Sequence, residues 1–220
     1  MFYLPSAGAD DWRRLLVDPE KQWRPGYSAH ALAQAWESAR GFPPEVRACL
    51  SDRFVECEPL FAVPEYKVPL PGGSRPSQND LFVLARLDGE LGVIMVEGKV
   101  AEPFGPTLTD WLKDASAGKR ERLAHLQTML GLQDIGGHIR YQLLHRTASA
   151  LIEARRFNSR YAVLLVHSFS AENAWLEDFQ AFTALYGARC DCGRLQRLAD
   201  RDGCGLLAAW VKGPLPATRP

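Results

Sequence analysis

The chain has 220 residues, of which 46% are hydrophobic and 10% aromatic, enough to bury a sizeable core in one domain. Its 26 basic and 26 acidic side chains cancel to a formal net charge of +0, which argues against a protein that coats polyanions non-specifically but leaves room for a local basic cleft. The opening letters MFYLPSAGADDW lack the pattern of a secretion signal, and no apolar run approaches the roughly 18 residues that span a bilayer. We therefore expect a cytoplasmic protein without membrane contact, whose five cysteines are reduced thiols.

The first quarter of the chain predicts short helices. Each has apolar residues at helical spacing, preceded by a capping residue or a proline. We place these helices at 10–16, at 29–40 and from Pro43 onward.

The middle of the chain predicts strands. Residues 60–68 form a possible strand bent at Pro64, and PLPGGSRPSQ, residues 69–78, is a loop by its proline, glycine and serine content. Two apolar runs follow, at 81–87 and 91–100. The dipeptide Asp88-Gly89 lies between them and is a strong signal for a β-hairpin.

The remaining elements alternate between helices and strands. We expect helices at 118–130, 138–157 and 175–186, and strands at 161–169 and 206–211. This order predicts an α/β domain with a mixed sheet.

The stretch VIMVEGKV, residues 93–100, places charge at the end of a buried strand. Glu97 and Lys99 share one face because side chains alternate along a strand, and Gly98 faces the other way. Counting outward from the hairpin turn pairs Asp80 with Glu97 to within two residues. Two adjacent carboxylates repel unless a cation lies between them, and Mg²⁺ binds such oxygens together with waters and phosphate oxygens. The plain alternative is a surface ion pair between Glu97 and Lys99, which does not explain why an apolar run leads directly into it.

Asp80, followed across a hairpin by Glu97-Gly98-Lys99, resembles the D…(D/E)xK signature of the PD-(D/E)XK nuclease superfamily. Longer stretches resemble a branch of uncharacterised bacterial proteins placed in that superfamily: KVPLPGGSRPSQND, VEGKVAEPFGP, WLKDASAGKRERL and RYQLLHRTASALIEARRFN. The resemblance to the nucleases themselves covers residues 60–169.

The resemblance implies a restriction-endonuclease-like core, with a mixed central sheet flanked by helices and an N-terminal helical extension. A single domain at 1–220 would then comprise a helical N-terminal part at 1–55, a catalytic core at 58–170, and a C-terminal helix and strand at 171–220.

The resemblance also implies roles for single residues. Asp80 and Glu97 match the metal-binding acids of the superfamily, the backbone carbonyl of Gly98 matches a further metal ligand, and Lys99 matches the catalytic lysine. Asn79 stands where the superfamily has a proline.

Two candidates come from position alone. Glu37 is the candidate for an acid that some families carry on the first core helix, where it joins a second metal site. Gln142 is a candidate site residue because some families have a glutamine on the helix after the lysine strand. Those families have a tyrosine four residues later, where this chain has Arg146.

The expected function is a phosphodiesterase or nuclease acting on DNA. The resemblance implies that Mg²⁺ or Mn²⁺ on Asp80 and Glu97 activates water, with Lys99 assisting. Three arginines are candidate contacts to the nucleic acid, namely Arg75, Arg140 and Arg146.

Other interpretations stay open at this point. A catalytically silent nuclease-fold protein could bind nucleic acid or a protein partner, and a small phosphoester could be the substrate. The oligomeric state is also open, with a homodimer among the options. His145 and His167 are candidate acid or base groups, although a buried histidine with satisfied hydrogen bonds is the favoured interpretation of His167.

Overall fold

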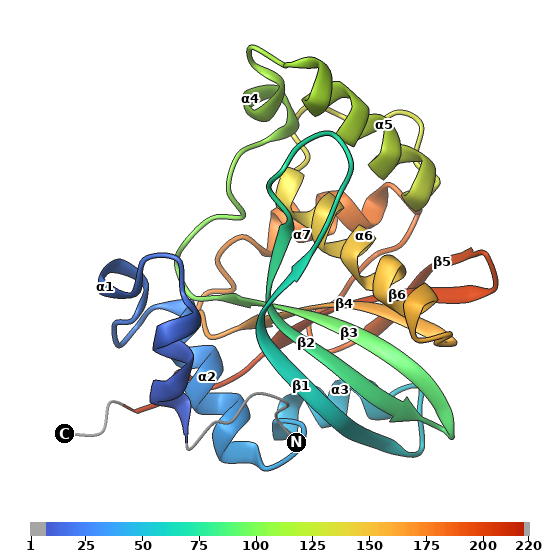
Figure 1. The fold of residues 1–220 in the computed structure, drawn as a ribbon. Helices are drawn as coiled ribbons and strands as arrows, with labels where there is room; N and C mark the ends of the chain where they lie inside the picture. Colours follow the sequence, from blue (N-terminus) through green and yellow to red (C-terminus); the bar gives the residue numbers. More distant parts are fainter. Residues whose placement is uncertain (1–7, 218–220) are drawn as a thin grey trace.

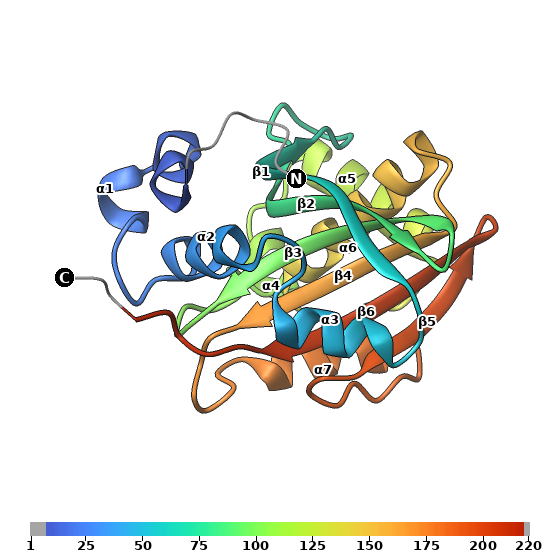
Figure 2. The ribbon, with the colours of Figure 1, turned by 90° about the horizontal axis from the view of Figure 1, so that it is seen from below.

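A computed structural model describes residues 8–217 as a six-stranded mixed sheet between two layers of helices (Figures 1 and 2). The predicted α/β class is confirmed. Within this described range, no helix combines the length and the apolar character needed to cross a membrane. The helices are η1 (Ala9–Leu15, a 3-10 helix), α1 (Pro19–Gln22), α2 (Ser28–Ala39), α3 (Pro44–Ser51), α4 (Leu108–Leu112), α5 (Ala117–Leu130), α6 (Tyr141–Arg156) and α7 (Leu176–Ala184). The strands are β1 (Cys57–Val68), β2 (Ser77–Leu87), β3 (Glu90–Lys99), β4 (Tyr161–Ser168), β5 (Leu195–Arg201) and β6 (Cys204–Lys212).

The strands lie in the order β1-β2-β3-β4-β6-β5. The first three form an antiparallel meander, β4 is parallel to both β3 and β6, and β5 is antiparallel to β6. The crossover from β3 to β4 contains α4, α5 and α6, as a parallel connection requires a helix-length segment. Strand β5 was not predicted, because this edge strand is half exposed and its sequence LQRLADR lacks clean alternation.

Both faces of the sheet are covered, which explains the uninterrupted apolar run in β3. Val93 and Met95 pack into the core beneath α5, α6 and α7, whereas Ile94 and Val96 pack into the second core with η1, α2 and α3. Figure 2 shows α2 and α3 across one face, with α5 and α6 behind the sheet. Successive residues of such a strand must all be apolar. A charged residue at its end therefore requires a specific partner.

The loop between β1 and β2 is held against α5 (Figure 1). Arg122, a buried residue of α5, donates hydrogen bonds to the carbonyls of Leu70, Pro71 and Gly73 at 2.8–3.2 Å. Gly72 has φ +76°, and a Cβ atom there would lie 2.1 Å from the carbonyl oxygen of Gly118. Only glycine permits both this backbone conformation and this close approach.

We expect Gly72→Ala to lower the free energy of unfolding by clearly more than the roughly 1 kcal/mol that a positive φ alone costs. Gly89→Ala is the matched control, because Gly89 also has a positive φ, +85°, but has open space around the position of a Cβ. Urea denaturation of both variants measures the difference. Equal losses would show that the contact with Gly118 relaxes without cost.

Candidate functional site

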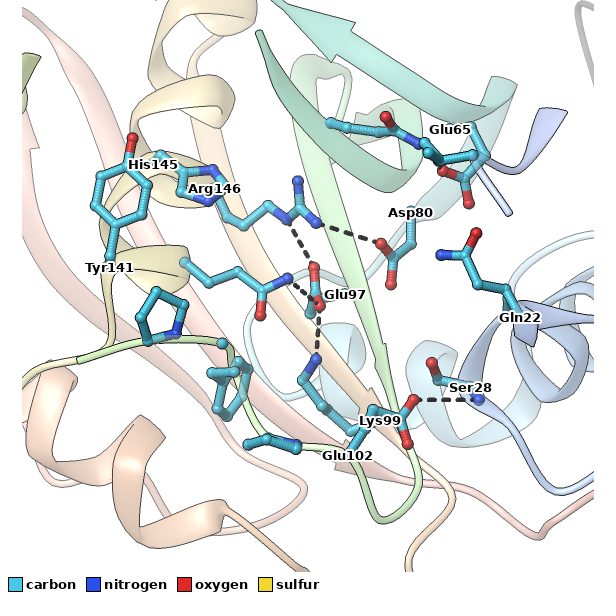
Figure 3. A pocket seen from close by; sticks show the side chains of 18 of the residues that line it. Gln22, Ser28, Glu65, Asp80, Glu97, Lys99, Glu102, Tyr141, His145 and Arg146 are labelled. Carbon is cyan, nitrogen blue, oxygen red and sulfur yellow. Dashed lines mark hydrogen bonds and ion pairs between the residues drawn. The ribbon is translucent and has the colours of Figure 1, made fainter. Parts of the chain in front are cut away.

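The site begins where the pairing of β2 with β3 ends. The last paired residues are Leu81 and Val96, so Asp80 and Glu97 are the next pair outward, as the count from the hairpin turn predicted. Beyond this pair, a side chain replaces the backbone as hydrogen-bond acceptor. Asp80 Oδ2 accepts a hydrogen bond of 2.9 Å from the N–H of Gly98. The end of the strand pairing thus leaves both acids facing α6 on the floor of a cleft (Figure 3).

Glu97 lies at the centre of a buried network. Its Oε1 accepts hydrogen bonds from Lys99 Nζ and Gln142 Nε2, both at 2.7 Å, and its Oε2 accepts one from Arg146 Nε at 2.6 Å (Figure 3). Glu97 and Lys99 are 2% and 3% exposed, so this is not a surface ion pair. Burial alone would raise the pKa of Glu97, but Arg146 and Lys99 outweigh it and hold that pKa well below its usual value. Glu97 is therefore ionised.

The negative charge of Asp80 is less completely balanced by nearby cations than that of Glu97. Its Oδ1 lies 3.4 Å from Arg146 Nη2, a long contact, and its side chain remains 21% exposed to the cleft. Burial and the neighbouring charge of Glu97 raise the pKa of Asp80 well above its usual value. Of the two paired acids, Asp80 is the one whose charge is still in need of a cation.

Glu65 is a third carboxylate of the site, which sequence reasoning missed. It lies on β1 beside Pro64 with φ +52°, and Figure 3 shows its carboxylate pointing toward Asp80. Gln78 donates a hydrogen bond to it, while burial and the charge of Asp80 raise the pKa of Glu65 to about 8. The pairing of Pro64 with Leu81 puts Glu65 opposite Asp80, but no tight turn joins these strands, so the sequence held no signal for this register.

The cleft has a volume of about 530 Å³. One wall is the first half of α6, which contributes Tyr141, Gln142, His145 and Arg146. The opposite rim is tied together by Glu102, which accepts N–H groups from the first residue of α2 and from the chain just after β3. The site is therefore assembled from β1, β2, β3, α2 and α6.

The donor set fits a hard divalent cation. Asp80 and Glu97 present oxygen atoms side by side, and the raised pKa values of Asp80 and Glu65 show that Lys99 and Arg146 do not fully compensate these two acids. A bound cation would favour their ionised forms. Among residues 8–217 no three or more His, Cys, Asp or Glu side chains converge as a ready-made cage. Mg²⁺ suits this arrangement, because it binds through one or two carboxylates and retains waters or phosphate oxygens.

Six of the predicted site residues converge here. Their side chains or backbone groups are hydrogen-bonded to one another in one network: Asp80, Glu97, Gly98, Lys99, Gln142 and Arg146. Gln142 is predicted from its place on the helix after the lysine strand, and in the structure it donates a hydrogen bond to Glu97. Arg146 was predicted as a contact to nucleic acid. Instead, its guanidinium binds Glu97 and Asp80 and is only 6% exposed.

Three other candidates lie outside the cleft. Glu37 does not reach it, because its side chain lies on another part of α2 and accepts a hydrogen bond of 2.9 Å from Trp12. Arg140 is paired with Asp178 at 2.8 Å and is not free to contact a ligand through that nitrogen. Arg75 lines a neighbouring groove.

His167 is a buried structural residue. Its ring accepts a hydrogen bond from Trp36 at 3.2 Å and lies 2.8 Å from a carboxylate oxygen of Glu45. The favoured interpretation of this histidine is confirmed. His145 lines the cleft, with its Nδ1 2.7 Å from the hydroxyl of Ser77.

Comparison with known proteins assigns a family without a function. Residues 5–215 match the family described as "Domain of unknown function (DUF6946)". The match covers nearly the whole chain, and the protein therefore belongs to this family. No curated protein and no solved structure matches the chain.

Proposed function

We propose that this member of the DUF6946 family is a divalent-metal-dependent phosphodiesterase that cleaves nucleic acid, with DNA as the expected substrate. The observation that carries the proposal is the convergence of Asp80, Glu97 and Lys99 on one side of a splayed pair of strands, at the floor of an open cleft. A structural ion pair does not need a second carboxylate, an open cleft and a buried lysine in the same place.

The residues of the site would have separate roles in binding the metal ion and in orienting its ligands. Asp80 and Glu97 would hold Mg²⁺ or Mn²⁺, with the carbonyl of Gly98 as the predicted further ligand. When bound, such an ion supplies positive charge that activates water and stabilises a phosphate under attack. Gln142 holds the orientation of Glu97 through a hydrogen bond of 2.7 Å.

Lys99 is the residue placed to act on the reacting atoms. Its ammonium lies 2.7 Å from Glu97 and 4.7 Å from the centre of the Phe104 ring, so its position is fixed. A preorganised cation in a partly dry cleft stabilises negative charge that develops on a phosphate oxygen. These features support a PD-(D/E)XK-like mechanism for the chain.

Titration of Mg²⁺ and Mn²⁺ by calorimetry tests the metal site. We expect wild-type protein to bind either ion, and Asp80→Asn to lose this binding together with cleavage of plasmid DNA, because one of the two paired carboxylates becomes neutral. Asp202→Asn is the matched control, since that acid is 71% exposed and pairs with Arg155 at the surface. Unchanged ion binding and cleavage in Asp80→Asn would refute the assigned site.

A catalytically silent binding protein is the second candidate, and one observation favours it. Arg146 contacts both Glu97 and Asp80, so the chain supplies a cation of its own at this site. Under this alternative, the protein binds an oligonucleotide or a protein partner but no divalent ion. Calorimetry with the ions alone separates the two candidates.

A further inference from the structure

Two smaller hollows lie beside the cleft. On the other side of Tyr141 and His145 lies a hollow of about 230 Å³, which shares these two residues and Pro76 with the cleft. A further hollow of about 220 Å³ shares Arg75, Trp111 and Arg122 with the first. We call these two hollows together the side groove. It runs between the 69–76 loop and the α4–α5 segment and adjoins the candidate active site.

The side groove differs from the cleft in charge. The cleft is lined by four carboxylates, whereas no Asp or Glu among the described residues lines the side groove, which instead has Arg75, Lys119 and Arg122. Arg122 is committed to the carbonyls of the 69–76 loop. Arg75 is exposed, and within the described part of the chain its side chain makes no ion pair. A free guanidinium in a groove without acids is suited to a phosphate group.

The floor of the side groove is aromatic. Trp111 stacks on Tyr141 with ring centres 4.0 Å apart and planes 10° apart. Lys119 Nζ lies 5.6 Å from the centre of the Trp111 ring and donates a hydrogen bond of 2.7 Å to the carbonyl of Trp111. The opposite wall is the loop that Arg122 and the Gly72–Gly118 contact hold in place. A basic groove with a flat aromatic surface is characteristic of sites that track a nucleic-acid strand.

We propose that the side groove binds the stretch of nucleic-acid strand that flanks the scissile phosphate, with its phosphates on Arg75 and Lys119 and its sugars and bases against the Trp111–Tyr141 pair. This inference rests on the proposed function and specifies its substrate. A small phosphoester would fill only the acidic cleft, where a metal ion offsets the carboxylates. A polynucleotide extends past that cleft and needs a second surface of opposite charge, which the side groove supplies.

Two substrates distinguish binding in the side groove from hydrolysis in the cleft. The first is a fluorescein-labelled single-stranded DNA oligonucleotide, and the second is bis(p-nitrophenyl) phosphate, which has no flanking phosphate for Arg75 or Lys119 to bind. We expect Arg75→Ala, and more strongly Arg75→Ala with Lys119→Ala, to lower kcat/KM for the oligonucleotide, by about tenfold for the double variant. Turnover of the small diester should stay unchanged. Arg86→Ala is the control, since Arg86 lies in β2 near the hairpin turn and pairs with Glu58 at the surface.

Binding measured without cleavage gives the second readout. In a Lys99→Ala background, fluorescence anisotropy should show weaker oligonucleotide binding for each groove variant, with the slope of log Kd against log salt reduced by about one for each phosphate contact removed. Normal oligonucleotide binding in Arg75→Ala, or an equal loss of activity on both substrates, would overturn the inference. Hydrolysis of the small diester without oligonucleotide binding by wild-type protein would overturn it too, while leaving the phosphodiesterase intact. Absence of hydrolysis and of binding would refute the proposed function itself.

Discussion

Cleavage of plasmid DNA is expected to fall by on the order of 10³-fold when Lys99 is replaced by alanine, which is the upper range for removing one preorganised group that stabilises charge in a transition state. The ammonium is buried, contacts Glu97 at 2.7 Å, and lies against Phe104. No other lysine among the described residues lines the cleft. Arg146, the other cation of the network, is already paired with Glu97 and Asp80, so we do not expect it to take over the position of Lys99.

The fold should survive this substitution. Glu97 keeps its hydrogen bonds from Arg146 and Gln142, so its charge is not left without a partner. Circular dichroism and the thermal midpoint check folding, and Lys21→Ala serves as the control, because Lys21 is 81% exposed and pairs with Asp18 on α1. A folded Lys99→Ala protein that cleaves at the wild-type rate would end the proposed mechanism.

Replacement of Arg146 by methionine is expected to have the largest effect on stability, a loss of about 3–5 kcal/mol in the free energy of unfolding. Methionine preserves most of the packing against α6 neighbours but removes the buried charge that contacts Glu97 and Asp80. Lys99 then remains the ion-pair partner of Glu97, whereas Asp80 loses its contact with Arg146 and must take up a proton or remain uncompensated. Because the pKa of Asp80 in the folded variant would be raised, the loss of stability should grow as pH rises through that value.

Arg155→Met is the matched control, since Arg155 lies on the same helix and forms an ion pair with Asp202 at the surface. A loss below about 1 kcal/mol is expected there. Urea denaturation with and without Mg²⁺ adds a test of the metal site, because an ion that binds Asp80 and Glu97 only in the folded state should recover part of the Arg146→Met loss. Similar losses in both arginine variants would contradict the central role of Arg146, and an absence of Mg²⁺ rescue would favour the catalytically silent alternative.

The pairing of Asp80 with Glu97 could be predicted because it depends on local rules. The Asp88-Gly89 turn sets the start of the hairpin, and each step outward advances both strands by one residue, so counting leads to the correct pair. Alternation along β3 puts Glu97 and Lys99 on one face for the same reason. The uninterrupted apolar runs likewise predicted the strands, and the structure covers both faces of the sheet that they form.

The other residues around Asp80 and Glu97 could not be predicted, because they lie on elements far away in the sequence. Glu65 joins the site because β1 pairs with β2. A long loop joins these two strands, and the backbone bends locally beside Pro64. No tight turn therefore sets the register of this pair, and counting residues from a turn does not predict it. Arg146 and Glu37 are both helical residues with charged side chains. The sequence does not show that the packing of α6 turns Arg146 into the network while Glu37 lies apart on α2.

By itself, the sequence determined the alternation of side chains along each strand, the hairpin and the pair of acids, because these follow from backbone geometry over a few neighbouring residues. Only the tertiary structure decided which helix faces the carboxylates and that a third acid joins them. It also decided that a basic aromatic groove adjoins the same cleft. Those features depend on how whole layers pack, and packing is determined by the combined shape of two cores.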